Sequence, residues 1–212
     1  MATTRRRSLL ILALALLAPA VAASASGSDS ALAQTLAPVT AADRSIGRAD
    51  APVTVVEYAS FACHHCADWH EFVYPGFKAR FIDTGQVRFV FRNLPTDPEE
   101  ISLPGAAVAR CAAPERFFDV AAALMHGQSA VLRGGNREDW YGPAIAVSGR
   151  TQAQIEACAV TPAVQAALNR DLESAEAAGV DSTPSFLVNG RRVTDRSLGG
   201  LEVAIRAAAA AR

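Results

Sequence analysis

The chain has 212 residues, half of them apolar, and a formal net charge of −1 at pH 7. This length fits one large domain, or a domain that carries an insertion. The sequence shows no basic patch, which argues against a nucleic-acid-binding protein. Alanine supplies much of the apolar fraction, and this indicates many helices rather than a membrane protein.

The first 25 residues have the pattern of a secretory signal. Three arginines at positions 5–7 precede a short apolar run at 9–17, and small residues continue to Ala25. This order predicts export and cleavage at or shortly before Ala25. A membrane anchor is the alternative, but the run is shorter than the roughly 20 residues that span a bilayer. Cleavage lowers the formal charge to about −4, and both the Sec and the twin-arginine routes fit the pattern.

Residues 26–45 are small and polar with scattered leucines, so we expect a flexible lead-in there. Residues 53–58 then predict a buried strand, because they are β-branched and apolar apart from Glu57. Beyond this strand, the apolar residues that follow Cys66 recur at the spacing of a helix. A strand therefore changes into a helix at the segment that contains Cys63 and Cys66.

This pair of cysteines, two residues apart, is the strongest motif in the chain. The start of a helix offers unpaired N–H groups and a partial positive charge, which stabilise a thiolate on Cys63. Cys66 follows one turn later and is placed to close a disulfide with Cys63. Together these features are typical of a thioredoxin-type redox site.

Two metal-binding interpretations compete with this one. A c-type haem needs histidine directly after the second cysteine, but Ala67 follows Cys66. Zinc on the two cysteines with His64 and His65 is chemically allowed. However, adjacent histidines at a helix start do not easily both face the thiolates. We therefore expect no cofactor beyond the disulfide of Cys63 and Cys66, and we keep a copper- or metal-binding module as an alternative of another class.

The rest of the chain completes the predicted fold. Residues 86–92 alternate as a second strand, and the helix between the two strands implies a right-handed parallel crossover. Residues 97–178 read as helices only, after which Asn189-Gly190 predicts a type I′ hairpin and an alanine-rich helix ends the chain. The prediction is an α/β thioredoxin fold with an inserted α-helical domain. Its parts are a first half (46–96), the helical insertion (97–178) and a second half (179–212).

With these blocks in place, the sequence resembles the DsbA-like branch of the thioredoxin superfamily, the bacterial periplasmic thiol–disulfide oxidoreductases. The matching features are the strand before F-x-C-x-H-C, the strand at 85–92 and the segment 179–190, and the resemblance runs from Ile46 to the C-terminus. It implies that Pro184 is cis and faces the CxxC disulfide. It also implies that Thr183 offers backbone groups to an extended substrate.

The resemblance also implies roles for the residues around the motif. Cys63 is the exposed nucleophile, Cys66 is the buried resolving thiol, and Glu57 is a buried acid that assists proton transfer at Cys66. We expect the His65 ring to donate toward the Cys63 sulfur, with His64 as a second donor or a solvent-facing side chain. His64 stands where DsbA itself usually has proline, which changes the dipeptide that tunes the reduction potential.

Two further cysteines, Cys111 and Cys158, fall in different predicted helices of the insertion. They are either two buried free thiols or a structural disulfide, and an oxidising compartment favours the disulfide. His70, one turn after Cys66, is interpreted as a residue of the polar helix face.

Taken together, the sequence predicts a periplasmic thiol–disulfide oxidoreductase. We expect it to act on exported, unfolded or partly folded proteins, first of all as an oxidase, and to use a membrane partner that re-oxidises or reduces it. A disulfide isomerase or reductase is the alternative, because Thr183 before the cis proline is common in isomerase-type relatives. The short lead-in favours a monomer, and a redox-inert scaffold on the same fold remains a third hypothesis.

Overall fold

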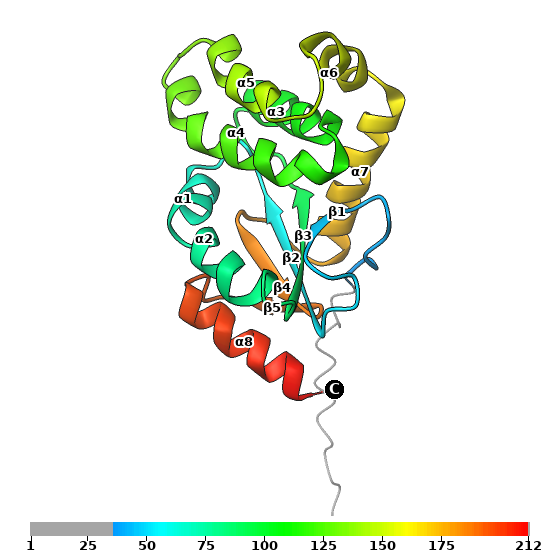
Figure 1. Ribbon diagram of the computed structural model, residues 1–212, viewed down its shortest axis with the longest axis vertical. Coiled ribbons are helices and arrows are strands. Elements are labelled where there is room, and N and C mark those ends of the chain that lie inside the picture. The colour runs from blue at the N-terminus through cyan, green and yellow to red at the C-terminus, as the bar shows by residue number, and fades with distance from the viewer. Residues whose placement is uncertain (1–35, 212) are drawn as a thin grey trace, which may run out of the picture. The chain divides into compact units, whose positions relative to one another are not determined.

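A five-stranded sheet with the strand order β1-β3-β2-β4-β5 lies at the centre of the computed structural model, which describes residues 36–211 (Figure 1). The predicted signal and most of the predicted lead-in lie outside these residues. β2 and β3 are parallel, as the predicted crossover requires, and the other pairs are antiparallel. The strands are β1 (Arg44–Ile46), β2 (Val53–Ala59), β3 (Val87–Asn93), β4 (Ser185–Val188) and β5 (Arg191–Val193).

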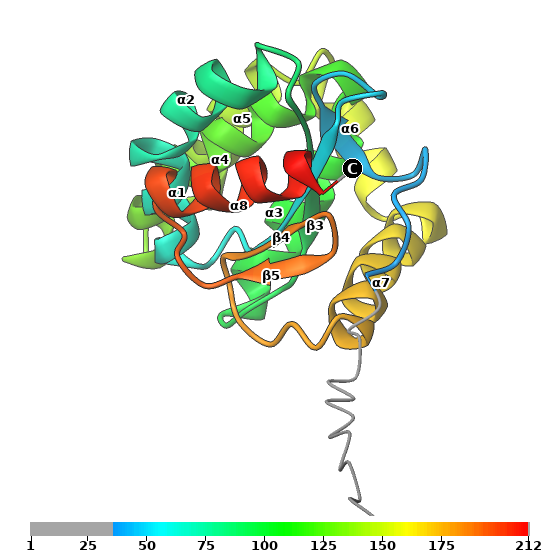
Figure 2. The same cartoon turned by 90° about the horizontal axis from the view of Figure 1, so that it is seen from below.

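Helices cover both faces of the sheet, which explains why β2 is apolar almost throughout. One face packs on a cluster that includes Trp69, Phe89 and Leu201, and the other face packs on Tyr58 and Ala175. Figure 2 shows α8 with α1 and α2 on one side and α7 on the other. The elements of the first face are α1 (His64–Phe72), α2 (Tyr74–Phe77), the π-helical turn η1 (Lys78–Ile82) and α8 (Leu198–Ala210), and α7 spans Pro162–Ala177.

The helices between β3 and β4 form the inserted domain, so the predicted fold class is confirmed. Their core contains Phe117 and Leu124, and it continues into Phe61 and Phe91 beside the CxxC segment. No helix in the described part of the chain has both the length and the apolar character needed to cross a membrane. Besides α7, the insertion contains α3 (Glu99–Cys111), the 3₁₀ turn η2 (Pro114–Arg116), α4 (Phe117–Leu132), α5 (Arg137–Ala146) and α6 (Gln152–Ala159).

Local sequence signals set most of the element ends, and one expectation needs correction. Thr151 and Gln154 form a capping box at the start of α6. Gly127 does not end its helix, because α4 continues to Leu132. Gly127 serves packing instead, because a Cβ there would lie 2.8 Å from the Trp140 ring. The short strand β1, placed in a loose lead-in by the sequence analysis, is held by its antiparallel partner β3.

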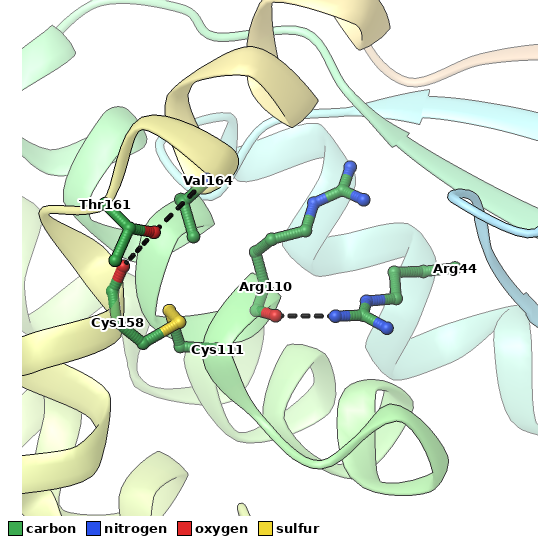
Figure 3. The surroundings of a disulfide bond; sticks show 6 residues. All are labelled: Arg44, Arg110, Cys111, Cys158, Thr161 and Val164. Atoms are coloured by element: carbon green, nitrogen blue, oxygen red, sulfur yellow. Dashed lines mark hydrogen bonds between the residues drawn. A yellow bond between two sulfur atoms is a disulfide. The ribbon is translucent and has the colours of Figure 1, made fainter.

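A disulfide joins Cys111, at the end of α3, to Cys158 in α6 (Figure 3). The S–S distance is 2.07 Å, and the two cysteines are 47 residues apart in the chain. Thr161 fastens the next helix to the same place, since its hydroxyl donates to the Cys158 carbonyl oxygen (2.7 Å) and accepts from the Val164 N–H (3.4 Å). The structure therefore has the bridge, and not the two free thiols that were the alternative.

A buried arginine ties the beginning of the described chain to the sheet. Arg92 of β3 is 3 % exposed, and its Nε donates to Asp43 at 2.8 Å. One terminal nitrogen donates to Ser174 of α7 (2.6 Å), and the other donates to the carbonyl oxygens of Ala37 (3.0 Å) and Pro38 (3.2 Å). A buried charge is tolerated only when it is paired and hydrogen-bonded. This set of partners meets that condition, and it fixes residues 37–43 against the sheet.

Candidate active site

The two active-site cysteines occupy the first turn of α1, directly after β2. Cys63 is the N-cap residue of α1 with extended backbone, so its side chain sits at the helix N-terminus. The N–H groups of Cys66 (3.0 Å) and Ala67 (3.2 Å) donate to the Cys63 carbonyl oxygen. Both thiols are free; Cys63 is half-buried and Cys66 is fully buried. The motif therefore has one accessible sulfur, that of Cys63, and one buried sulfur, that of Cys66, which only the Cys63 sulfur can reach.

The surroundings of Cys63 favour its thiolate. A hydrogen bond from the Cys66 thiol is the largest favourable contribution, and the Thr183 side chain and the N–H groups of Cys66 and His65 add to it. Burial acts in the opposite direction but is outweighed, and the pKa of Cys63 falls to about 5. At neutral pH the accessible sulfur is therefore ionised, which is the state that attacks a disulfide.

The surroundings of Cys66 have the opposite effect. Burial raises the pKa of Cys66 well above that of an ordinary thiol, and the hydrogen bond to Cys63 and the nearby charge of Glu57 raise it further. A charged group loses solvation when it is buried, so the neutral thiol is favoured. The two cysteines thus differ strongly in acidity although they are one helical turn apart.

The loop before β4 faces the motif. The peptide bond between Thr183 and Pro184 is cis, and the Cys63 sulfur lies 3.4 Å from the Thr183 carbonyl oxygen, to which it donates when protonated. Arg196 holds this loop, because its guanidinium donates to the Pro184 carbonyl oxygen (3.1 Å) and its own carbonyl accepts from the Trp69 indole (2.9 Å). Both sides of the site are therefore linked by hydrogen bonds through one residue.

Glu57 lies in the middle of β2 with its side chain fully buried. Its side-chain partner within the described residues is His70 of α1, whose Nε2 is 2.9 Å from one carboxylate oxygen and 3.2 Å from the other. The interpretation of His70 as a polar surface residue is wrong, since its side chain is 4 % exposed. Helical spacing alone could not reveal this, because α4 packs over that face of α1.

The two histidines between the cysteines lie at the surface. His64 and His65 are both exposed, and their ring centroids are 3.9 Å apart. Among the described residues, the His65 ring makes no hydrogen bond to Cys63; the backbone N–H of His65 supports the thiolate instead. The expected ring contact is therefore replaced by a contact that any residue at this position would make.

Gln128 of α4 also belongs to the site, although no sequence motif marks it, and it is 1 % exposed. Its amide donates to the carbonyl oxygens of Phe61 (2.8 Å) and Cys63 (3.1 Å), so the inserted domain reaches the backbone of the motif. One signal was available, because Gln128 stands four residues after Leu124, on the apolar face of its helix. Between residues 36 and 211, no group of three or more His, Cys, Asp or Glu side chains is placed to hold a metal ion.

Comparison with known proteins agrees with this geometry. The family model described as thioredoxin matches residues 40–207. A protein of Rickettsia prowazekii, named as a candidate protein-disulfide oxidoreductase, is 27 % identical over 166 residues. That match includes 77 % of this chain, and this chain spans about 60 % of the length of that relative.

Solved structures share the fold. Wolbachia pipientis α-DsbA1 superposes with a TM-score of 0.71 at 23 % identity, over 83 % of this chain and 94 % of that one. A thioredoxin-like oxidoreductase from Silicibacter pomeroyi superposes with a TM-score of 0.68 at 25 % identity, over 82 % of this chain and 95 % of that one. Since the family model matches most of the sequence and these structures share the inserted helices, the chain belongs to the thioredoxin family and has the DsbA-like form of its fold.

Proposed function

We propose that the protein is a thiol–disulfide oxidoreductase that exchanges the Cys63–Cys66 disulfide with cysteines of other proteins. The observation that carries the proposal is the difference between the two sulfurs beside a cis proline. Cys63 is accessible and has its pKa lowered to about 5, whereas Cys66 is buried and has its pKa raised. Cys63 then attacks or is attacked by the substrate, and Cys66 resolves the mixed disulfide.

The preferred direction is oxidation of the substrate. A cysteine whose thiolate is stable is a good leaving group, so a disulfide that contains it is strongly oxidising. The Rickettsia relative, which is named for disulfide oxidoreductase activity, agrees with exchange but does not give the direction. An isomerase or reductase is the second candidate, because threonine before the cis proline, here Thr183, is common in the isomerase-type relatives that the sequence resembles.

The surface beside Cys63 suits an extended, unfolded segment of a substrate protein. A shallow groove of about 300 Å³ runs between α1 and the cis-proline loop, and both Trp69 and Pro184 line it. At its edge the Phe72 side chain is 74 % exposed, which is unusual for a large apolar residue. Together with the predicted export signal, this supports exported proteins as substrates, the periplasm as the compartment and a membrane redox protein as the partner that restores the disulfide. We expect the protein to act as a monomer.

Substitution of each cysteine tests the exchange. Cys66→Ser should accumulate mixed disulfides between Cys63 and substrate proteins, because nothing remains to resolve them, whereas Cys63→Ser should neither trap substrate nor turn over. Non-reducing electrophoresis with reduced and denatured ribonuclease as substrate reports both results. Normal turnover by Cys66→Ser would contradict the assigned roles.

The equilibrium with glutathione separates the two directions. An oxidase should have a potential near −120 mV, an isomerase a potential near −180 mV, and a reductase a potential near −270 mV. A value near −180 mV or −270 mV would favour the second candidate.

A further inference from the structure

The side chains of Glu57 and His70 form a pair that is buried in the protein. The two side chains are 0 % and 4 % exposed, and the distance from His70 Nε2 to the nearer carboxylate oxygen is 2.9 Å. Water therefore does not reach the carboxylate directly. Among the described residues, His70 is the side chain that hydrogen-bonds the carboxylate, so it offers Glu57 a hydrogen-bonded connection away from Cys66.

Such a route matters because Cys66 must lose a proton each time the disulfide closes and regain one each time it opens. The Cys66 side chain is fully buried, so bulk water is not at hand to take the proton. The charge of Glu57 acts on Cys66 strongly enough to raise the pKa of this thiol. The carboxylate is thus the nearby base, and the question is how it exchanges protons with solvent.

A small cavity next to His70 connects this side chain with solvent. A space of about 180 Å³ lies between α1 and α4 and is lined by Ala67, His70, Glu71, Ala122, Met125 and His126. Of these residues, His70 is the one that also contacts Glu57. The volume is large enough for several water molecules. Glu71 and His126 are exposed, so the cavity lies at the protein surface and not in the core.

We propose that Glu57 and His70 form a relay that carries the Cys66 proton to water in the cavity between α1 and α4. The inference rests on the proposed function and assigns to this chain an exit route behind the motif, away from the substrate groove. His70 acts through Glu57: it holds the carboxylate in place, and it passes a proton to the cavity water. It is not a residue that touches the reacting sulfurs.

The step balances as follows, starting from a mixed disulfide on Cys63. Cys66 gives its proton to Glu57, its sulfur attacks the Cys63 sulfur, and the Cys63–Cys66 bond forms. The bond from Cys63 to the substrate sulfur breaks, and the substrate leaves as a thiolate with the electron pair. At the same time the His70 ring releases its Nδ1 proton to cavity water. The charge of the pair is unchanged, and the reverse sequence supplies the proton when the disulfide opens.

Other ionisable groups surround the relay, and the test must separate them from it. The ring of Tyr74 in α2 lies 5.1 Å from that of His70, and its buried hydroxyl has no hydrogen-bond partner among the described residues. Burial and the charge of Glu57 raise the pKa of Tyr74, so this phenol stays neutral in the working range. The remaining groups are Glu71 of α1, His126 and Asp119 of α4, and Asp83 after η1.

The reaction of the reduced protein with Ellman's reagent reports the two halves of the cycle separately. Attack by Cys63 releases one coloured thiolate, and resolution by Cys66 releases the second. Stopped-flow absorbance would follow both phases between about pH 5 and pH 9 in the parent, His70→Gln, Glu57→Gln and the double variant. Glutamine at position 70 can still donate to Glu57 but cannot exchange a proton.

We expect His70→Gln to leave the first phase unchanged and to slow the second phase at pH 7 by about 100-fold, the lower end of the range for general acid–base catalysis. The loss should shrink toward pH 9, where hydroxide replaces the relay. The double variant should be no slower than Glu57→Gln alone, because the two groups act as a unit. His126→Gln is the matched control, since it makes the same change at the same cavity without touching Glu57, and it should behave as the parent does.

Two results would overturn the inference. One is a second phase in His70→Gln that equals the parent at every pH, and the other is a loss by the same factor at every pH, as a purely structural role predicts. Absence of the first phase in the parent would instead remove the proposed function. If His70→Gln does not fold, His70→Ala with added imidazole takes its place. Restoration of the second phase by imidazole supports the relay, and a folded variant that imidazole leaves slow contradicts it.

Discussion

The side-chain amide of Gln128 donates a hydrogen bond of 3.1 Å to the carbonyl oxygen of Cys63. The donor belongs to α4 of the inserted domain, and the acceptor is the N-cap residue of the catalytic helix. This carbonyl also accepts from two N–H groups of α1. The inserted domain therefore helps to set the direction of the backbone from which the reactive sulfur projects, in addition to covering the site.

Replacing Gln128 by leucine should slow thiol–disulfide exchange. The substitution leaves the buried Phe61 carbonyl without this donor, which costs about 1–3 kcal/mol of stability. It also frees the Cys63 backbone, and a small displacement of a reacting group lowers the rate by roughly tenfold or more. Single-turnover exchange at Cys63 and chemical denaturation measure the two effects. Gln165→Leu, at an exposed position of α7, is the control and should change neither; an equal loss in both variants would remove the role of Gln128.

The stability of the reduced protein should depend on pH through Cys63. Its pKa is about 5 in the folded protein and about 9.0 for an ordinary thiol. A lowered pKa stabilises the folded state fully above the unfolded value, and the stabilisation is lost as the pH falls through the folded value. The Tm of the reduced protein, measured relative to that of the oxidised protein, should therefore decrease as the pH falls from about 9 to about 5. Scanning calorimetry of both forms measures it. Cys63→Ser, which has no oxidised form of this pair, is compared with the reduced parent and should lack that decrease.

Replacing His65 by serine should change the reduction potential only slightly. The ring is exposed and the backbone N–H that supports the thiolate remains in the variant. Exposed charge interactions contribute about 0.2–1 kcal/mol, and 30 mV corresponds to about 1.4 kcal/mol for this couple. We expect a decrease below about 20 mV in glutathione redox buffers, and a similar change for His64→Ser. A decrease of about 30–60 mV would instead show that the His65 ring turns onto Cys63 in solution.

Removing the second disulfide should destabilise the protein without affecting the chemistry at Cys63. Cys111 and Cys158 close a loop of 47 residues, for which the chain-entropy model gives about 4 kcal/mol. We expect the double alanine variant to lose about 2–4 kcal/mol in urea unfolding and to keep the parent exchange rate within about twofold. A tenfold loss of rate in the folded variant would show that the bridge also shapes the active site.

Much of the fold could be predicted because its signals are local. The parallel strands, the Asn189-Gly190 hairpin and the capping box at Thr151 each depend on residues near one another in the chain. β1 could not be predicted, because a strand of three residues is too short to show a pattern of its own. Its pairing with β3 holds it in place.

At the site, the same distinction holds. Cys63 and Cys66 could be found from their spacing, and Pro184 from the resemblance. The burial of His70 could not be predicted, because it depends on α4 packing against α1. For Gln128, its place on the apolar face of its helix predicts burial but not its contact with the Cys63 carbonyl. The exposure of His65 is likewise not visible in the spacing of the motif.

The buried Arg92 limits how far the chain can be shortened in the laboratory. A variant that starts after Asp43 would retain the guanidinium but lose its carboxylate, and an orphaned buried charge destabilises a protein by about 3–5 kcal/mol. The carbonyl oxygens of Ala37 and Pro38 would be lost with it. Affinity tags and fluorescent fusions therefore belong ahead of Leu36, where they leave every partner of this arginine in place.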